Sequence, residues 1–403
     1  MAAADPIAAS VQDVLKDGPY ACSNLVKLTG GTANFVYRAT LDNPLPDGSS
    51  TIVIKHTEGY VALSPTFNLT STRCEFEQAV LTALGQLAPS THADITVLTP
   101  HLYHFDVETN TQVYTDLPAS TDLKTYCLTH SLNPQECTRL GNSLGIWAKH
   151  FHTWGAAPEQ AGVREIMKRN TAMRDLKFQI NYSRLLERIE SFPDLLESSR
   201  ALFEEIGKEI RLEVDGGQGT LIHGDFWSGN VILPNAPFPA SLDTPLKTFI
   251  IDWELSHIGS IAFDLGQMFA ELFELKHFKN IDAGAELIAA FMQGYGPLPR
   301  DLAFRTAVHF GTHLICWGSS VQGWGTKEQV EKVVEIGRGC VTRAWAGDRE
   351  CEQKRVRDRW ISYLLANSLD LLKCYENPYQ PSKRSPWPGV TSSSDAVVSD
   401  AGV

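Results

Sequence analysis

The 403-residue sequence contains no uninterrupted apolar run near the roughly 20 residues that a membrane-spanning helix needs. Its first residues, MAAADPIAASVQDVLKDG, lack the basic start and the apolar segment of a secretory signal. None of the eight cysteines stands in a C-x-x-C pair or in a Cys/His cluster with zinc spacing. These absences predict a cytoplasmic protein with no membrane partner, whose cysteines are reduced thiols.

Positive charge is also scarce, with 35 Lys and Arg against 47 Asp and Glu and a net charge of −12. Nucleic-acid binding depends on a basic patch, so this balance argues against a nucleic-acid partner. The excess of negative charge weakly favours a cationic or neutral substrate.

The most informative stretch that is present covers residues 221–233, LIHGDFWSGNVIL. Apolar segments flank a polar turn, which indicates a loop between two short strands. Asp225 and Asn230 stand five residues apart in it (230 − 225 = 5). A kinase catalytic loop has this D-x-x-x-x-N spacing; its Asp accepts the proton of the substrate hydroxyl and its Asn holds Mg²⁺.

Other parts of a phosphoryl-transfer site stand around this loop in chain order. Residues 247–254, KTFIIDWE, predict a buried strand that ends at Asp252, where a kinase places the Asp that reaches the phosphates through Mg²⁺. Residues 26–38 predict strand, turn and strand, with Gly30 and Gly31 in the turn. Glycines in a hairpin more often serve turn geometry than phosphate binding, so this pair has weight only together with the other motifs.

A lysine and its acidic partner follow the glycine turn. Residues 51–55, TIVIK, form a β-branched run that ends in Lys55, like the V-A-I-K lysine of kinases. Residues 73–84 have helical spacing, with Glu77 in one stripe with leucines at 81 and 84. Glu75 lies roughly 200° around the same helix. We therefore expect Glu77 to pair with Lys55, although an exposed helix glutamate is the alternative for either residue.

The predicted organisation has four parts: an N-terminal helical extension (1–20), an ATP-binding N-lobe (21–117), a helical C-lobe (118–376) and a disordered tail (377–403). The tail is rich in proline and serine and has no hydrophobic pattern.

Backbone groups of Thr115 and Leu117, between the lobes, are expected to hold the adenine edge. Residues 160–212 predict two or three helices. We expect His152 to be structural, and Asp264 to be a helix N-cap or a polar anchor for the catalytic loop.

The sharpest motifs are H-G-D-x-x-x-x-N at 223–230, I-D-x-E at 251–254 and F-D-L-G at 263–266. With them the chain resembles small-molecule kinases of the aminoglycoside phosphotransferase and choline kinase group, over roughly residues 20–375. The resemblance implies an α+β, protein-kinase-like fold of two lobes. A small N-lobe with an antiparallel sheet and one helix would stand beside a larger helical C-lobe, with ATP between them.

The resemblance also implies roles for single residues. Asp225 corresponds to the catalytic base, and Asn230 and Asp252 to the Mg²⁺ ligands. Lys55 corresponds to the phosphate-binding lysine. Glu254 completes an Asp-x-Glu pattern as in the choline kinase and methylthioribose kinase branches, and is expected to contact the metal directly or to support its ligands. His-Arg-Asp, Asp-Phe-Gly and Ala-Pro-Glu of protein kinases are missing, which favours a small alcohol over a protein as substrate.

The sequence thus predicts an ATP- and Mg²⁺-dependent phosphotransferase acting on a small molecule's hydroxyl. Amino alcohols, sugars, aminoglycosides and secondary metabolites all remain open as acceptors, and the sequence does not indicate an oligomeric state. The alternative is an inactive pseudokinase that binds nucleotide or serves as a scaffold. Pseudokinases usually lose the lysine, the base or a metal ligand, and this chain has all of them. A phosphatase or nuclease would leave Lys55 and the strand–turn–strand unexplained.

Overall fold

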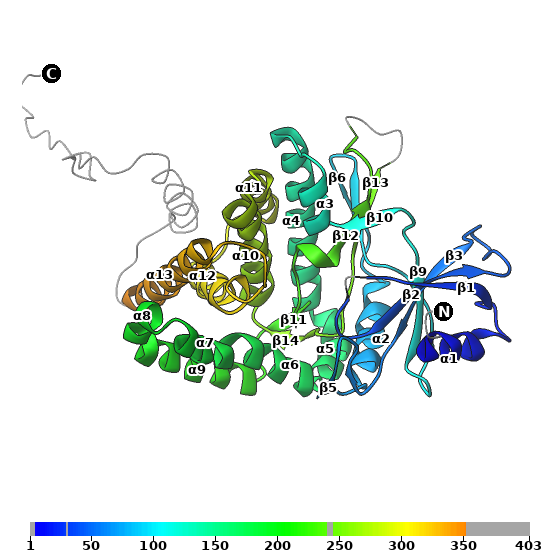
Figure 1. Ribbon diagram of the computed structural model, residues 1–403, viewed down its shortest axis with the longest axis horizontal. Coiled ribbons are helices and arrows are strands. Elements are labelled where there is room, and N and C mark those ends of the chain that lie inside the picture. The colour runs from blue at the N-terminus through cyan, green and yellow to red at the C-terminus, as the bar shows by residue number, and fades with distance from the viewer. Residues whose placement is uncertain (1–4, 30, 240–244, 352–403) are drawn as a thin grey trace, which may run out of the picture.

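The computed structural model describes residues 5–29, 31–239 and 245–351, with side chains to residue 347. They form two lobes, with the N-lobe at the right of Figure 1 and a larger helical lobe at the left. The N-lobe sheet has the order β1-β2-β3-β9-β8, and each neighbouring pair is antiparallel. Its strands are Cys22–Lys27, Phe35–Leu41, Thr51–His56, Thr111–Thr115 (β9) and Leu102–Asp106 (β8). The predicted α+β, two-lobed class is confirmed.

Alternation along β3 determines what each face of this sheet carries. Ile52 and Ile54 are fully buried and pack with Val11 and Leu15 of helix α1 (Pro6–Leu15). Lys55 is one residue out of phase with them and therefore lies on the opposite face. That face is covered by helix α2 (Arg73–Leu84), which is how the lysine reaches a helix partner.

A short hairpin of β4 (Tyr60–Val61) and β5 (Ser64–Asn68) lies beside the turn between β1 and β2. The amides of Ala62 and Leu63 donate to the carbonyls of Ala33 and Thr32, at 3.1 Å each. The turn is therefore supported by neighbouring backbone. Gly31 is exposed in it, and Gly30 lies outside the described residues.

A second five-stranded sheet has the order β10-β12-β13-β7-β6. Its strands are Ser120–Asp122, Val231–Pro234 (β12), Leu246–Ile250 (β13), Ile95–Leu98 (β7) and Ser90–His92 (β6). Here β13 runs parallel to β7, so residues 95–98 of the expected N-lobe pair with a strand more than a hundred residues later in the chain. A two-stranded ladder joins β11 (Thr220–Ile222) to β14 (His257–Gly259).

The helical lobe begins with α3 (Leu123–Thr129) and α4 (Pro134–Ala156). Residues 161–215 form α5 (Ala161–Lys168), α6 (Thr171–Phe178), α7 (Arg184–Ser191), α8 (Pro193–Leu196) and α9 (Arg200–Asp215). The prediction of two or three helices was wrong there for two reasons. A π-helical segment, Gln179–Ser183, separates α6 from α7. Pro193 cannot continue α7, which ends at the non-helical backbone of Phe192. The lobe continues with α10 (Ile261–Lys279), α11 (Ala283–Tyr295), α12 (Arg300–His313) and α13 (Lys327–Cys351).

No helix in the described part of the chain is long and apolar enough to cross a membrane. The six cysteines whose side chains are described are free thiols, and five of them are buried. Cys351 and Cys374 fall outside that set. The predicted tail, residues 377–403, also lies outside the described residues.

Helices α4 and α11 approach closely because Gly145 has no side chain. A Cβ atom there would lie 2.1 Å from the Phe291 carbonyl oxygen and 2.7 Å from the Tyr295 amide. We expect Gly145→Ala to destabilise the protein by about 1–3 kcal/mol, measured by urea unfolding, because the helices would have to separate. Gly162→Ala in α5 is the control, since nothing lies within 4 Å of that position. Equal effects of the two substitutions would contradict the expectation.

Candidate active site

The loop from His223 to Asn230 connects β11 to β12 and has a fixed backbone. Gly224 adopts φ +82°, and a Cβ atom there would lie 2.2 Å from the Leu255 carbonyl oxygen. Only glycine fits this position. The His223 ring accepts from the Asp225 amide at Nδ1 (3.2 Å) and donates from Nε2 to the Ile251 carbonyl (3.0 Å). Burial lowers the pKa of His223, so its neutral ring is a structural support for the loop.

Asp225 is oriented by two side-chain amides. Gln267 of α10 donates from Nε2 to Asp225 Oδ1 at 2.7 Å, and Asn230 donates to Oδ2 at 3.2 Å and to the Asp225 carbonyl at 2.8 Å. The Gln267 amide is in turn fixed by Lys177 of α6, whose Nζ lies 2.5 Å from Oε1. Lys177 is buried, and that burial lowers its pKa. The carboxylate of Asp225 therefore points in one direction, set from the helical lobe.

Asp264 fixes the backbone at the start of this loop. Its carboxylate accepts from the amides of His223 (2.8 Å) and Gly224 (2.9 Å) and from His152 Nε2 (3.1 Å). The N-cap of α10 is Ser260, so of the two roles expected for Asp264 the structure supports the anchor. His152 is buried and bridges Asp264 to the hydroxyl of Tyr295, a structural arrangement as predicted.

Lys55 stands between two carboxylates from different lobes. Its Nζ lies 2.9 Å from the Glu77 carboxylate and 2.6 Å from Asp252 Oδ1. Burial by itself lowers the pKa of Lys55, but the surrounding carboxylates outweigh it and raise that pKa. Asp252 has φ 66°, a conformation that costs a non-glycine residue on the order of 1 kcal/mol. Burial opposes ionisation of Asp252, yet Lys55 holds its pKa below the usual value.

The amide oxygen of Asn230 and the carboxylate of Asp252 are suited to a hard cation such as Mg²⁺. The two residues are brought together because the Ile251 amide donates to the Asn230 carbonyl at 3.0 Å. The hydrogen bonds of the Asn230 side chain use its nitrogen, and no described residue donates to its oxygen. The donor set therefore fits the predicted metal. Glu254 differs, because its Oε2 accepts from Arg73 and Asn34.

The predicted adenine contacts lie in the segment between the lobes, where the two backbone amides differ. The Leu117 amide makes no hydrogen bond among the described residues, whereas the Thr115 amide donates to the His101 carbonyl at 2.9 Å. Both contacts stay predictions. Asp116 is structural: it accepts two hydrogen bonds from Arg38, at 2.8 and 2.9 Å, and one from Thr51.

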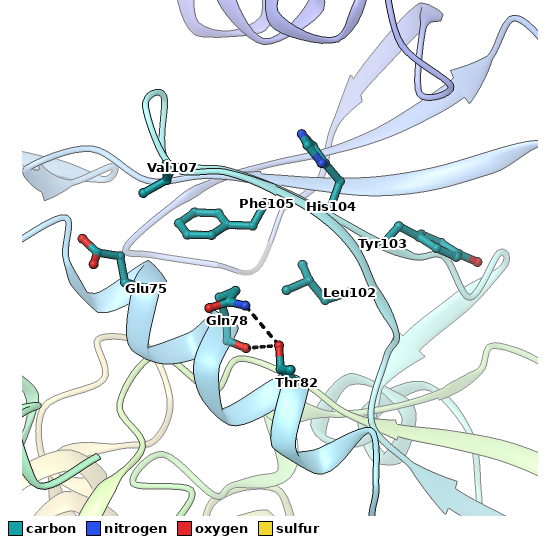
Figure 2. A pocket seen from close by; sticks show the side chains of 8 residues that line it. All are labelled: Glu75, Gln78, Thr82, Leu102, Tyr103, His104, Phe105 and Val107. Carbon is teal, nitrogen blue, oxygen red and sulfur yellow. Dashed lines mark hydrogen bonds between the residues drawn. The ribbon is translucent and has the colours of Figure 1, made fainter. Parts of the chain in front are cut away.

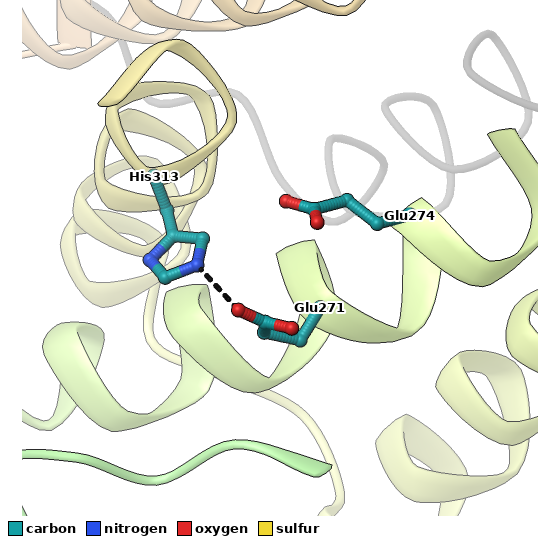
Figure 3. A group of neighbouring side chains, drawn as sticks. All are labelled: Glu271, Glu274 and His313. Carbon is teal, nitrogen blue, oxygen red and sulfur yellow. Dashed lines mark hydrogen bonds and ion pairs between the residues drawn. The ribbon is translucent and has the colours of Figure 1, made fainter. Parts of the chain in front are cut away.

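The face of α10 that carries Gln267 also carries two glutamates. Glu271 and Glu274 follow Gln267 by four and seven residues, so the three side chains share one face. Figure 3 shows both carboxylates turned toward His313 of α12, with His313 Nε2 at 3.1 Å from Glu271 Oε1. Lys124 of α3 pairs with Glu271 at 3.0 Å. The donor atoms of Glu271, Glu274 and His313 lie within 4.8 Å of one another, close enough to hold a cation.

Glu75 lies apart from this machinery. It lines a pocket of about 520 Å³ between α2 and β8, with Gln78, Leu102 and Phe105 (Figure 2). The pairing of Lys55 with Glu77 rather than Glu75 thus follows from the helical phase of the two glutamates.

Sequence reasoning did not assign Gln267, Lys177, Arg73 or Asn34. Gln267 had a usable signal, because it stands three residues after Asp264 on one helix and so faces the same loop. Arg73 and Asn34 lie in the stretches that contain Glu77 and the glycine turn, but nothing in the sequence pattern distinguishes them there. Lys177 had no signal, since its contact comes from a helix whose position depends on tertiary packing.

Residues 31–305 match the phosphotransferase enzyme family (APH). The chain is similar to phosphotransferase FrzJ of Cladobotryum sp, at 33% identity over 373 residues, 87% of this chain and 95% of FrzJ. It is also similar to 4-hydroxytryptamine kinase of Psilocybe cyanescens, at 24% identity over 316 residues, 77% of this chain and 84% of the relative. A solved streptomycin–ATP complex of APH(2")-IIa aligns with a TM-score of 0.44 at 14% identity, over 84% of this chain and 97% of that one.

The family match spans more than half of the chain and agrees with the family named from the H-G-D-x-x-x-x-N and Asp-x-Glu motifs. The chain therefore belongs to the APH phosphotransferase family, whose members phosphorylate small molecules.

Proposed function

We propose that this protein transfers the γ-phosphoryl group of ATP to a hydroxyl of a small amine-bearing molecule. The observation that carries the transfer is the fixed Asp225 carboxylate, held by Gln267 and Asn230 beside a lysine–carboxylate pair. In this step the acceptor oxygen bonds to the γ-phosphorus and the bond to the β-phosphate oxygen breaks. The hydroxyl proton passes to Asp225, and ADP leaves.

The residues of the chain mostly position and stabilise charge in this proposal. Asp225 orients the hydroxyl and takes its proton, and Lys55 holds the donor phosphates while Glu77 fixes the lysine. Asn230 and Asp252 would hold Mg²⁺, which when bound neutralises charge on the phosphates. The pseudokinase alternative predicts nucleotide binding without turnover.

The amine on the acceptor is proposed because of two glutamates, Glu271 and Glu274, on the face of α10 that carries Gln267. Glu274 is 1% exposed, and its Oε1 accepts no hydrogen bond among the described residues. Burial, reinforced by the Glu271 charge, raises the pKa of Glu274 well above its usual value. A buried carboxyl oxygen without a donor is costly, and a ligand ammonium would supply one. Because a helix rises 1.5 Å per residue, Glu271 and Glu274 lie about 6 and 10 Å beyond Gln267.

The relatives named 4-hydroxytryptamine kinase agree with such an acceptor, since that name describes a hydroxylated amine. The direct test is Mg²⁺-dependent ATP consumption on a panel of alcohols. It should include choline, ethanolamine, hydroxylated tryptamines, aminoglycosides, methylthioribose and homoserine, each amine with an amine-free analogue. Turnover on an amine and none on its analogue supports the proposal. ADP binding without turnover on any member favours the pseudokinase alternative.

We expect Glu274→Gln to lower kcat/KM for an amine acceptor by about 10–100-fold, because glutamine keeps an acceptor oxygen but cannot supply the negative charge that would pair with the ligand ammonium. The amine-free analogue should be nearly unaffected in a side-by-side measurement. Glu328→Gln, at an exposed position on α13, is the matched control. Equal losses on both acceptors would contradict a role for Glu274 in amine recognition.

A further inference from the structure

Arg73 lies at the start of α2 and is completely buried. Its Nε donates to Glu254 Oε2 at 3.0 Å, so the two charges compensate each other. Its other nitrogens donate to the carbonyls of Glu58, Leu69 and Thr70, and to the Ala33 carbonyl and Asn34 Oδ1. A buried guanidinium with this many partners has one allowed orientation.

Asn34 closes the same arrangement from the glycine turn. Its Nδ2 donates to Glu254 Oε2 at 2.8 Å, and its Oδ1 accepts from Arg73 at 2.9 Å and from Thr57 at 3.0 Å. Asn34 is 7% exposed and Glu254 is 2% exposed. The contacts therefore join the turn between β1 and β2 to α2 and to the segment that follows β13.

The position of these contacts connects them to the reaction. Glu254 follows Asp252 by two residues, and its carboxylate lies 3.9 Å from Lys55 Nζ. The turn that carries Asn34 is the predicted phosphate-binding turn. A shift of Glu254 would consequently move the turn, the metal-binding carboxylate and the lysine relative to one another.

We propose that Asn34, Arg73 and Glu254, here called the Arg73 cluster, are positioning residues for phosphoryl transfer. They hold the glycine turn in register with Asp252, and Glu254 serves the cluster instead of binding the metal. This inference rests on the proposed function, because it assigns the nucleotide to the space between the turn and Asp252. Of the two roles expected for Glu254, it favours support of the metal ligands over direct contact with Mg²⁺.

The test compares Glu254→Gln with Asp252→Asn. Glutamine keeps an oxygen that accepts from Arg73 and Asn34 but removes the charge. We expect Glu254→Gln to weaken ADP affinity without Mg²⁺ and to raise KM for ATP, each by about tenfold, as measured by calorimetry and kinetics. KM for the acceptor and the Mg²⁺ concentration for half-maximal rate should stay within about twofold. Asp252→Asn should instead raise the Mg²⁺ requirement.

Arg73→Lys and Arg73→Met, with Asn34→Ala as a milder change, complete the design. Lysine should retain more ADP affinity than methionine, and an Arg73→Met/Glu254→Met double variant should lose no more than the worse single variant, because the two side chains act as a pair. Glu75→Gln, at an exposed position of α2, is the control expected to match the native protein.

The inference is overturned if Glu254→Gln shifts the Mg²⁺ requirement as Asp252→Asn does, or lowers only the melting temperature. ADP binding remains measurable if no acceptor is turned over, so this result is independent of the acceptor assignment.

Discussion

Asp225→Asn is expected to lower kcat by about 10²–10⁴-fold, the range for removing a general base. Asparagine has the same shape and its oxygen can still accept from Gln267, but its amide cannot take the hydroxyl proton at neutral pH. KM for ATP and the affinity for ADP should change little, because the proposed function assigns Asp225 to the acceptor hydroxyl and not to the nucleotide. The measurement is ATP consumption with the best acceptor from the panel, together with ADP calorimetry.

The matched control is Asp42→Asn, an exposed aspartate of the N-lobe, which should leave kcat at the native value. A native turnover rate in Asp225→Asn would remove Asp225 from the role of base. A loss of ADP affinity equal to the loss of kcat would point instead to a collapsed donor site. Single-turnover kinetics distinguish a slow chemical step from slow product release.

Much of this site follows from the sequence because its chemistry is concentrated in short stretches. The D-x-x-x-x-N spacing places Asp225 and Asn230 in one loop, and the strand before Asp252 delivers that residue beside them. The pairing of Lys55 with Glu77 follows from the side-chain periods of the two elements. The period is two residues along β3 and 3.6 residues along α2. These features are local, so the one-dimensional pattern is sufficient.

The remaining features depend on contacts between distant segments. Arg73 meets Glu254 across 181 positions of the chain, and Lys177 meets Gln267 across 90. The parallel pairing of β7 with β13 also joins segments with no shared pattern. A single sequence shows that a charged residue is present, but its burial and its partner are determined by tertiary packing. The pairing of Arg73 with Glu254 therefore could not be predicted from the sequence.

The role of Asp264 follows partly from a local sequence motif and partly from contacts between distant segments. Its position in F-D-L-G suggested an anchor, and the structure supplies three donors to one fully buried carboxylate. Burial by itself would raise the pKa of Asp264, but the bonds from His152 and the His223 amide outweigh it and lower that pKa. The ionised carboxylate therefore stabilises the fold, and its contribution depends on pH in a defined direction.

Asp264→Ala is expected to lower the free energy of unfolding by about 3–5 kcal/mol, because the amides of His223 and Gly224 and the His152 ring would lose a buried charged acceptor. A folded-state pKa below the ordinary 3.8 means that this contribution is complete above that pH and is lost as the pH falls. Urea unfolding at several pH values should therefore show the largest difference from the native protein near neutrality and convergence in acid.

Asp13→Ala, at an exposed position on α1, is the control and should leave the unfolding midpoint unchanged at every pH. The catalytic loop is held in place by Asp264, so activity should fall together with stability and return in part at low temperature, where more of the variant is folded. A variant with native stability and no activity would contradict the anchor, because it would place Asp264 in the chemical step. A difference from the native protein that grows in acid would contradict the ionised form of the buried carboxylate.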